Sequence, residues 1–103
     1  MARYVLVYTG GRTGADPEEQ QAIIDRWMGW FGALGTGLLD GGSPFGPSST
    51  VTAEGSSDGG ASSLTGYTII AAADLAAATE AARGCPVLAA GGTVEVYETV
   101  EMG

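Results

Sequence analysis

The sequence has no histidine, no lysine and only one cysteine, Cys85. Without histidine, the chain cannot build a Ser-His-Asp or Cys-His nucleophile, or a metal site that uses imidazole ligands. A single thiol excludes both a thiolate metal cluster and a disulfide within the chain. We therefore expect no metal and no cofactor, and we expect a reducing, cytoplasmic compartment.

Positive charge is also scarce, because the only cations are four arginines in a chain of net charge −8. A nucleic-acid backbone or an anionic lipid surface would repel such a protein. No apolar run approaches the roughly 20 residues that span a bilayer. We therefore expect neither nucleic acid nor a membrane as a partner.

The length of 103 residues predicts a single domain over residues 1–103, near the lower size limit for a self-sufficient core. The 18 glycines are clustered, which is typical of turns rather than of disordered sequence. A second subunit would help so small a domain to bury apolar surface.

The first third of the chain predicts a strand followed by a capped helix. The β-branched and aromatic run from Tyr4 to Tyr8 indicates a buried strand. Asp16 before Pro17 is typical of a helix N-terminus, and the glycines after Leu34 are typical of a helix end. The core face of this helix is predicted from residues spaced three and four apart: Ile23, Ile24, Trp27, Met28, Phe31 and Leu34.

Weaker patterns follow in the rest of the chain. We expect short strands at 38–40 and 50–52, a strand at 66–72, a helix from Asp74 to Gly84 and a half-exposed strand at 93–101. Residues 54–63 are rich in glycine, serine and alanine without periodicity, which predicts an irregular surface loop. In the last strand, Val94, Val96, Glu98 and Val100 should share one face.

This order predicts an α+β fold, a ferredoxin-like two-layer sandwich with the order βαββαβ and an extra short strand. Its two helices cover only one face of the antiparallel sheet. The other face carries apolar strand residues and must meet water or another subunit. We therefore expect a homodimer that buries the helix-free face.

Asp40 is the ionisable residue of most interest, because it ends an apolar strand and enters a Gly-Gly turn near Pro44 and Phe45. Partial burial would raise the pKa of its carboxyl and suit it to acid or base catalysis. Alternatively, Asp40 caps the turn by accepting hydrogen bonds from the backbone. The sequence leaves both roles open.

Five residues are candidates for binding a small molecule. The hydroxyls of Tyr67 and Tyr97 could point into a pocket, and Trp30 is the aromatic residue that the helical core spacing explains least. Ser43 and Phe45 lie in the glycine-rich turn. A cleft lined by these five side chains would bind a ligand without needing a catalytic group.

Five segments, taken in order, carry a family resemblance: Tyr4–Tyr8, Leu39–Gly46, Leu64–Ile70, Gly84–Leu88 and Val94–Glu98. Together they resemble the YCII-related proteins, which include a group named for an Asp-Gly-Pro-Phe (DGPF) motif. The resemblance implies a ferredoxin-like subunit and a dimeric α+β barrel, in which two sheets pack face to face around a cleft. For some members a His-Asp active site is proposed, and some related domains are fused to or encoded beside extracytoplasmic-function sigma factors.

Two departures separate this chain from the family pattern. It has no histidine for a His-Asp pair, and residues 58–61 read Asp-Gly-Gly-Ala in place of Asp-Gly-Pro-Phe. Three functions remain, in order of preference. The chain is a dimeric small-molecule-binding module, a cofactor-free enzyme in which Asp40 moves a proton, or a regulatory protein-interaction module linked to sigma-factor signalling.

Overall fold

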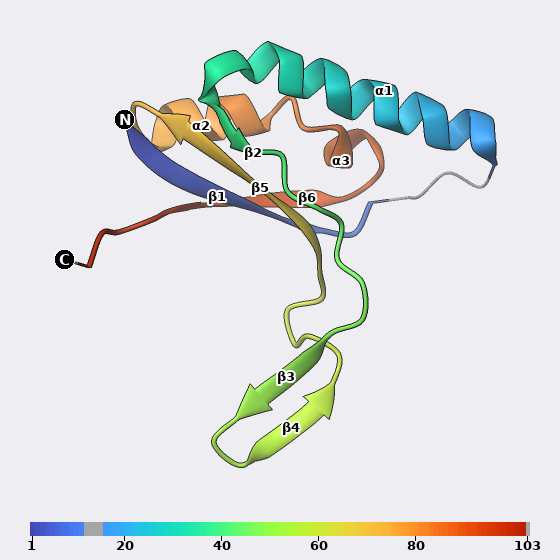
Figure 1. Ribbon diagram of the computed structural model, residues 1–103, viewed down its shortest axis with the longest axis vertical. Helices are drawn as coiled ribbons and strands as arrows, with labels where there is room; N and C mark the ends of the chain where they lie inside the picture. The colour runs from blue at the N-terminus through green and yellow to red at the C-terminus, as the bar shows by residue number, and fades with distance from the viewer. Residues whose placement is uncertain (12–15, 103) are drawn as a thin grey trace.

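The computed structural model describes residues 1–11 and 16–102, and at its centre is a four-stranded antiparallel sheet with helices on one face (Figure 1). The strands of this sheet are β1 (Ala2–Thr9), β2 (Leu38–Asp40), β5 (Leu64–Ala72) and β6 (Thr93–Glu98). The helices are α1 (Pro17–Leu34), η1 (Gly35–Gly37), α2 (Leu75–Ala82) and α3 (Pro86–Ala89). A separate hairpin of β3 (Ser49–Thr52) and β4 (Gly55–Asp58) projects away from the sheet.

The strand order β2-β5-β1-β6 is that of a ferredoxin-like sheet with a hairpin inserted after its second strand, which confirms the predicted α+β fold. On β1, the side chains of Tyr4, Leu6 and Tyr8 are buried under the helices. Tyr8 pairs with Val94 and Leu6 pairs with Val96, so β6 presents its valines to the same core, as predicted. This strand ends at Glu98 rather than at residue 101.

Helix α1 begins and ends where the sequence predicts. The Asp16 carboxylate accepts a 2.8 Å hydrogen bond from the backbone N–H of Glu19, and Pro17 is the first helical residue. After Leu34 the backbone of Gly35 has a φ of 56°, a conformation that glycine adopts without the steric cost of a side chain.

The predicted core face of α1 is partly wrong. Ile24 and Met28 are 53% and 62% exposed, whereas Trp30 is only 7% exposed. The helix packs against α3 as well as against the sheet, which rotates its buried surface toward Trp30. The predicted face residues that do pack against the core are Trp27, Phe31 and Leu34.

The segment 54–63 is not an irregular loop throughout, because β4 lies within it and pairs with β3. The strand predicted at 50–52 therefore belongs to this hairpin and not to the main sheet. Ser48 holds the base of the hairpin, since its carbonyl accepts from Gly59 N–H and its hydroxyl accepts from Gly60 N–H, each at 2.8 Å. This hairpin has mostly short polar side chains and no buried face. Its sequence therefore shows no alternation of apolar and polar residues from which the strands could be predicted.

Tyr4 makes the stability of this fold sensitive to alkaline pH. Its hydroxyl donates a 2.8 Å hydrogen bond to Glu98 Oε1. Burial, and then the Glu98 carboxylate, raise the pKa of Tyr4 from 10.0 to about 12, because both disfavour the phenolate. Since the folded pKa is the higher one, this stabilisation is complete below pH 10 and is lost as the pH rises through about 12.

We expect Tyr4→Phe to reduce the fall in the urea midpoint between pH 10 and 12, because phenylalanine cannot ionise. Urea titrations followed by circular dichroism at several pH values would measure it. Below pH 10 the variant should be the less stable protein, since it lacks the hydrogen bond to Glu98. An equally steep alkaline fall in both proteins would contradict the assignment.

Candidate functional site

The helix-free face of the sheet is the first candidate site. Val5 of β1 pairs with Ile69 of β5 on one side and with Tyr97 of β6 on the other. Paired residues of antiparallel strands lie on the same face, and these alternate with the residues that the helices cover. We call this surface the open face, and its central residues are Arg3, Val5, Val7, Asp40, Tyr67, Ile69, Ala71, Glu95 and Tyr97.

A bulge places Asp40 on the open face. Leu38 pairs with Ile70, whose side chain is buried under the helices, yet Asp40 pairs with Ile69. In a regular strand, residues two apart point to the same face. The extra residue, Leu39, is therefore what brings the Asp40 carboxylate to the opposite face, as bulges commonly re-aim a side chain.

Both carboxylate oxygens of Asp40 have partners. Oδ1 accepts a 2.8 Å hydrogen bond from the N–H of Gly42, and Oδ2 lies 3.4 Å from the hydroxyl of Tyr67, which donates to it. The first contact is the turn cap, one of the two roles that the sequence left open for Asp40. The Asp40 side chain is exposed, so the expected partial burial of Asp40 is wrong.

Phe45 and Tyr67 form a stacked pair beside Asp40. Their ring centroids are 5.8 Å apart with an interplanar angle of 20°. Pro44 forms an isolated bridge with Gly66, so the turn after β2 runs alongside β5 and carries Phe45 over Tyr67. Ser43, also predicted as a ligand-binding residue, lies in this turn and is exposed. We call Asp40, Phe45 and Tyr67 the Asp40 cluster.

Tyr97 lies at the other edge of the open face, with β1 between it and the Asp40 cluster. Its hydroxyl donates a 2.5 Å hydrogen bond to Glu95 Oε1. This hydrogen bond, and then the charge of Glu95, raise the pKa of Tyr97. The open face thus has an apolar strip of Val5 and Val7 between two carboxylate-bearing edges.

The structure does not bring Trp30 to the open face. Its indole Nε1 donates a 3.1 Å hydrogen bond to the carbonyl of Ala81 in the helix layer, on the other side of the sheet. There it lines a groove of about 770 Å³, which we call the interhelical groove. The residues that line this groove are Arg26, Trp30, Ala33, Arg83, Gly84, Cys85, Pro86, Leu88 and Ala89.

Sequence reasoning missed the interhelical groove because it did not predict α3. The available signal was Pro86, which begins this short helix, since proline is favoured at the first helical position. Cys85 lies in the wall of the groove but is only 3% exposed. Burial raises the pKa of its thiol, which makes it a poor nucleophile.

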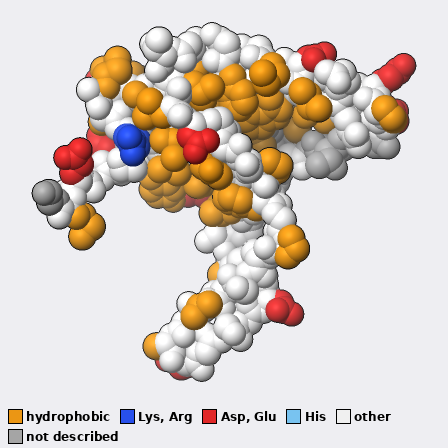
Figure 2. Space-filling model, viewed as in Figure 1, with side chains coloured by type: hydrophobic (Ala, Val, Ile, Leu, Met, Phe, Trp, Pro, Cys, Tyr) orange, Lys and Arg blue, Asp and Glu red, His pale blue; other side chains and the backbone are white. Residues whose placement is uncertain are grey.

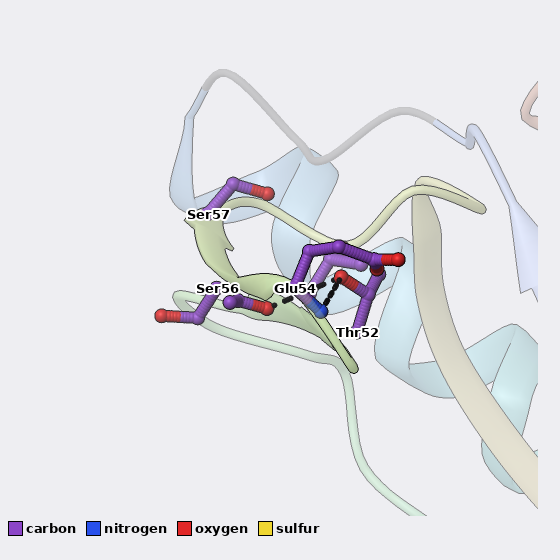
Figure 3. A pocket seen from close by; sticks show the side chains of 6 residues that line it. Thr52, Glu54, Ser56 and Ser57 are labelled. Carbon is purple, nitrogen blue, oxygen red and sulfur yellow. Dashed lines mark hydrogen bonds between the residues drawn. The ribbon is translucent and has the colours of Figure 1, made fainter.

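A smaller hollow of about 230 Å³ lies on the projecting hairpin (Figure 3). The hydroxyl of Thr52 accepts a 3.3 Å hydrogen bond from the N–H of Glu54 and donates at 3.4 Å to the carbonyl of Gly55. These hydrogen bonds close the hairpin turn. They account for the hollow without a ligand, and no large apolar side chain lines it.

Two classes of site find no support among residues 1–11 and 16–102. No group of three or more His, Cys, Asp or Glu side chains in these ranges could hold a metal ion. No helix in the same ranges is both long and apolar enough to cross a bilayer.

Comparison with known families gives one result. The family model described as the YCII-related domain matches residues 32–103. This range contains the whole Asp40 cluster and every strand except β1. Neither the curated proteins nor the solved structures contain a significant match.

Proposed function

This chain belongs to the YCII-related domain family, and from its open face we propose that it is a dimeric module that binds a small molecule between two sheets. One observation carries the proposal: the open face has an apolar strip between two edges that each pair a tyrosine with a carboxylate. Val5 and Val7 of the strip are only half-buried, whereas Tyr4, Leu6 and Tyr8 of the same strand are buried under the helices.

Pairing of two open faces accounts for this half-buried strip. A domain of 103 residues has little core to spare, and an apolar sheet face left in water favours association. A two-fold pairing would bury Val5, Val7, Ile69 and Ala71 of both copies. The Asp40 cluster and the Glu95–Tyr97 pair, at the edges of the strip, would then line the cleft between the copies.

The charge of the open face indicates the class of ligand. Asp40 and Glu95 are acidic, and Arg3 is the one basic residue among its central residues. The aromatic rings of Phe45 and Tyr67 suit a flat apolar body or a cation above the ring. We infer a neutral or cationic amphipathic ligand with an aromatic part, because an anion would be repelled by the two carboxylates.

Tryptamine and indole-3-acetate test this proposal, because they share one ring system and carry opposite charges. We expect tryptamine to bind at least about tenfold more tightly in calorimetric titrations, and to perturb the amide resonances of Tyr67 and Tyr97. Phe45→Ala should weaken tryptamine binding about tenfold, by loss of stacking area. Ile24→Ala, on the helix layer, is the matched control and should leave binding unchanged. Equal binding of both probes, or of neither, would contradict the proposal.

The 3.4 Å contact between Tyr67 and Asp40 favours a second candidate, cofactor-free proton transfer. Asp40→Asn tests it, because an amide oxygen can still accept from Gly42 N–H. We expect the free energy of unfolding to fall by only about 1 kcal/mol. Proton transfer is measured as the rate at which acetylacetone takes up deuterium in heavy water. If the protein is a binding module, this rate should be the same with the variant and with the wild type. A loss of at least about a hundredfold in the variant would instead establish the enzyme.

A further inference from the structure

The interhelical groove is lined by residues of α1, of α3 and of the segment that joins α2 to α3. Figure 1 shows these helices on one side of the sheet, so the groove lies on the opposite side from the open face. Pairing of two open faces would therefore leave it accessible. One wall comes from α1, with Arg26, Trp30 and Ala33, and the other from residues 83–89. The groove does not contain any residue of the open face, so it needs a separate explanation.

The base of the groove is apolar and preformed. Trp30 and Cys85 are 7% and 3% exposed, and the hydrogen bond from Trp30 to Ala81 holds the indole in place. A Cβ added at Gly84 would lie 3.0 Å from Trp30 Cδ1, so the two walls meet closely at the base. Leu88, 43% exposed, offers an apolar side chain above it.

Among the described residues, those that line the groove include basic but no acidic side chains, although the chain has net charge −8. Two of the four arginines, Arg26 and Arg83, line it. Arg83 Nε lies 3.2 Å from Glu80 Oε2, and both side chains are about three-quarters exposed. Such an exposed pair is worth little, so Arg83 can exchange this carboxylate for that of a ligand. At physiological ionic strength, salt largely screens the repulsion between an acidic ligand and carboxylates of this chain that lie more than about 8 Å from it.

We propose that the interhelical groove binds an acidic amphipathic helix of a partner protein. From Arg26 to Ala33 the α1 wall is about 10 Å long, or two helical turns. A helix would place apolar residues spaced three and four apart on Trp30 and Leu88, with its acidic side chains toward the two arginines.

A peptide library supplies the probe for this proposal. Its members are about fourteen residues long, with leucines at positions i, i+3, i+4 and i+7 and a random choice of Glu, Lys, Gln or Ser elsewhere. Selection on the full-length protein should enrich glutamate over lysine. The selected peptides should bind Leu88→Asp, and separately the Arg26→Glu/Arg83→Glu double variant, at least about tenfold more weakly than wild type.

Met28→Asp is the matched control, because Met28 lies on α1, does not line the groove and is 62% exposed. It should bind the selected peptides as wild type does. Failure to select binders, enrichment of lysine, insensitivity to the groove variants or loss of binding in Met28→Asp would each overturn the proposal. Dodecanoate is the small-anion probe. If it displaces the peptides, binds as tightly as they do and loses affinity in the Arg26→Glu/Arg83→Glu variant, the groove is a small-molecule site and the helix proposal fails.

Discussion

Ile69→Asp should dissociate the proposed dimer into monomers of 10.3 kDa. Ile69 lies at the centre of the open face, between Val5 on β1 and Asp40 on β2. In the proposed dimer, an aspartate there would be buried without a partner, which costs several kcal/mol. We therefore expect the dissociation constant to rise at least about a hundredfold, since each 1.4 kcal/mol changes it tenfold. Sedimentation equilibrium at micromolar concentration would measure it.

Two further variants make this experiment decisive. Ile24→Asp introduces the same charge on α1, where the native side chain is 53% exposed, and should leave the dimer intact. Ile69→Thr keeps the β-branched shape that strands favour and should weaken association even if the aspartate variant does not fold. A wild-type protein that sediments as a monomer, or equal dissociation of the two aspartate variants, would contradict the dimer.

Gly42→Ala should cost about 3 kcal/mol or more of unfolding free energy. Gly42 has a φ of 74°, and a Cβ there would lie 1.7 Å from the carbonyl oxygen of Tyr67. No side-chain rotation relieves a clash with backbone, so the turn would have to move away from β5. Because Asp40 caps this turn through the N–H of Gly42, tryptamine binding should be lost together with stability.

Gly46→Ala provides the control for this variant. A Cβ at Gly46 has no atom within 4 Å, and its φ lies outside the left-handed region. Its stability should stay within about 0.5 kcal/mol of wild type. Urea unfolding of both variants, with tryptamine titration of each folded protein, would measure the difference. Equal stability of the two would show that the turn does not hold the Asp40 cluster.

The elements that the sequence predicted correctly have local causes. The cap of Asp16 on Glu19 N–H, the helix end at Gly35 and the shared face of Val94 and Val96 each depend on neighbours a few residues away. Such signals are readable because capping and alternation repeat within a turn or a strand. The order of these elements was enough to predict the ferredoxin-like α+β class.

The structure brings together only some of the residues that the sequence indicated for a cleft. Phe45 and Tyr67 do lie beside Asp40, and Tyr97 shares their face, as a single cleft requires. Trp30 does not, because its helix lies on the opposite side of the sheet. Spacing along a helix shows which residues share one face of it, but packing against neighbouring helices decides which face is buried.

By itself, the amino-acid sequence determined which side chains are available for chemistry, the class of fold, the limits of α1 and the approximate positions of the long strands. Tertiary structure alone decided which face Asp40 occupies, because one extra residue at Leu39 shifts the register of β2 against β5. A pairing register depends on a strand distant in sequence, and a shift of one residue exchanges the two faces of a strand. Figure 2 shows hydrophobic side chains gathered over α1 and over the sheet below it. Which hydrophobic side chains stay exposed is likewise decided by packing between distant segments.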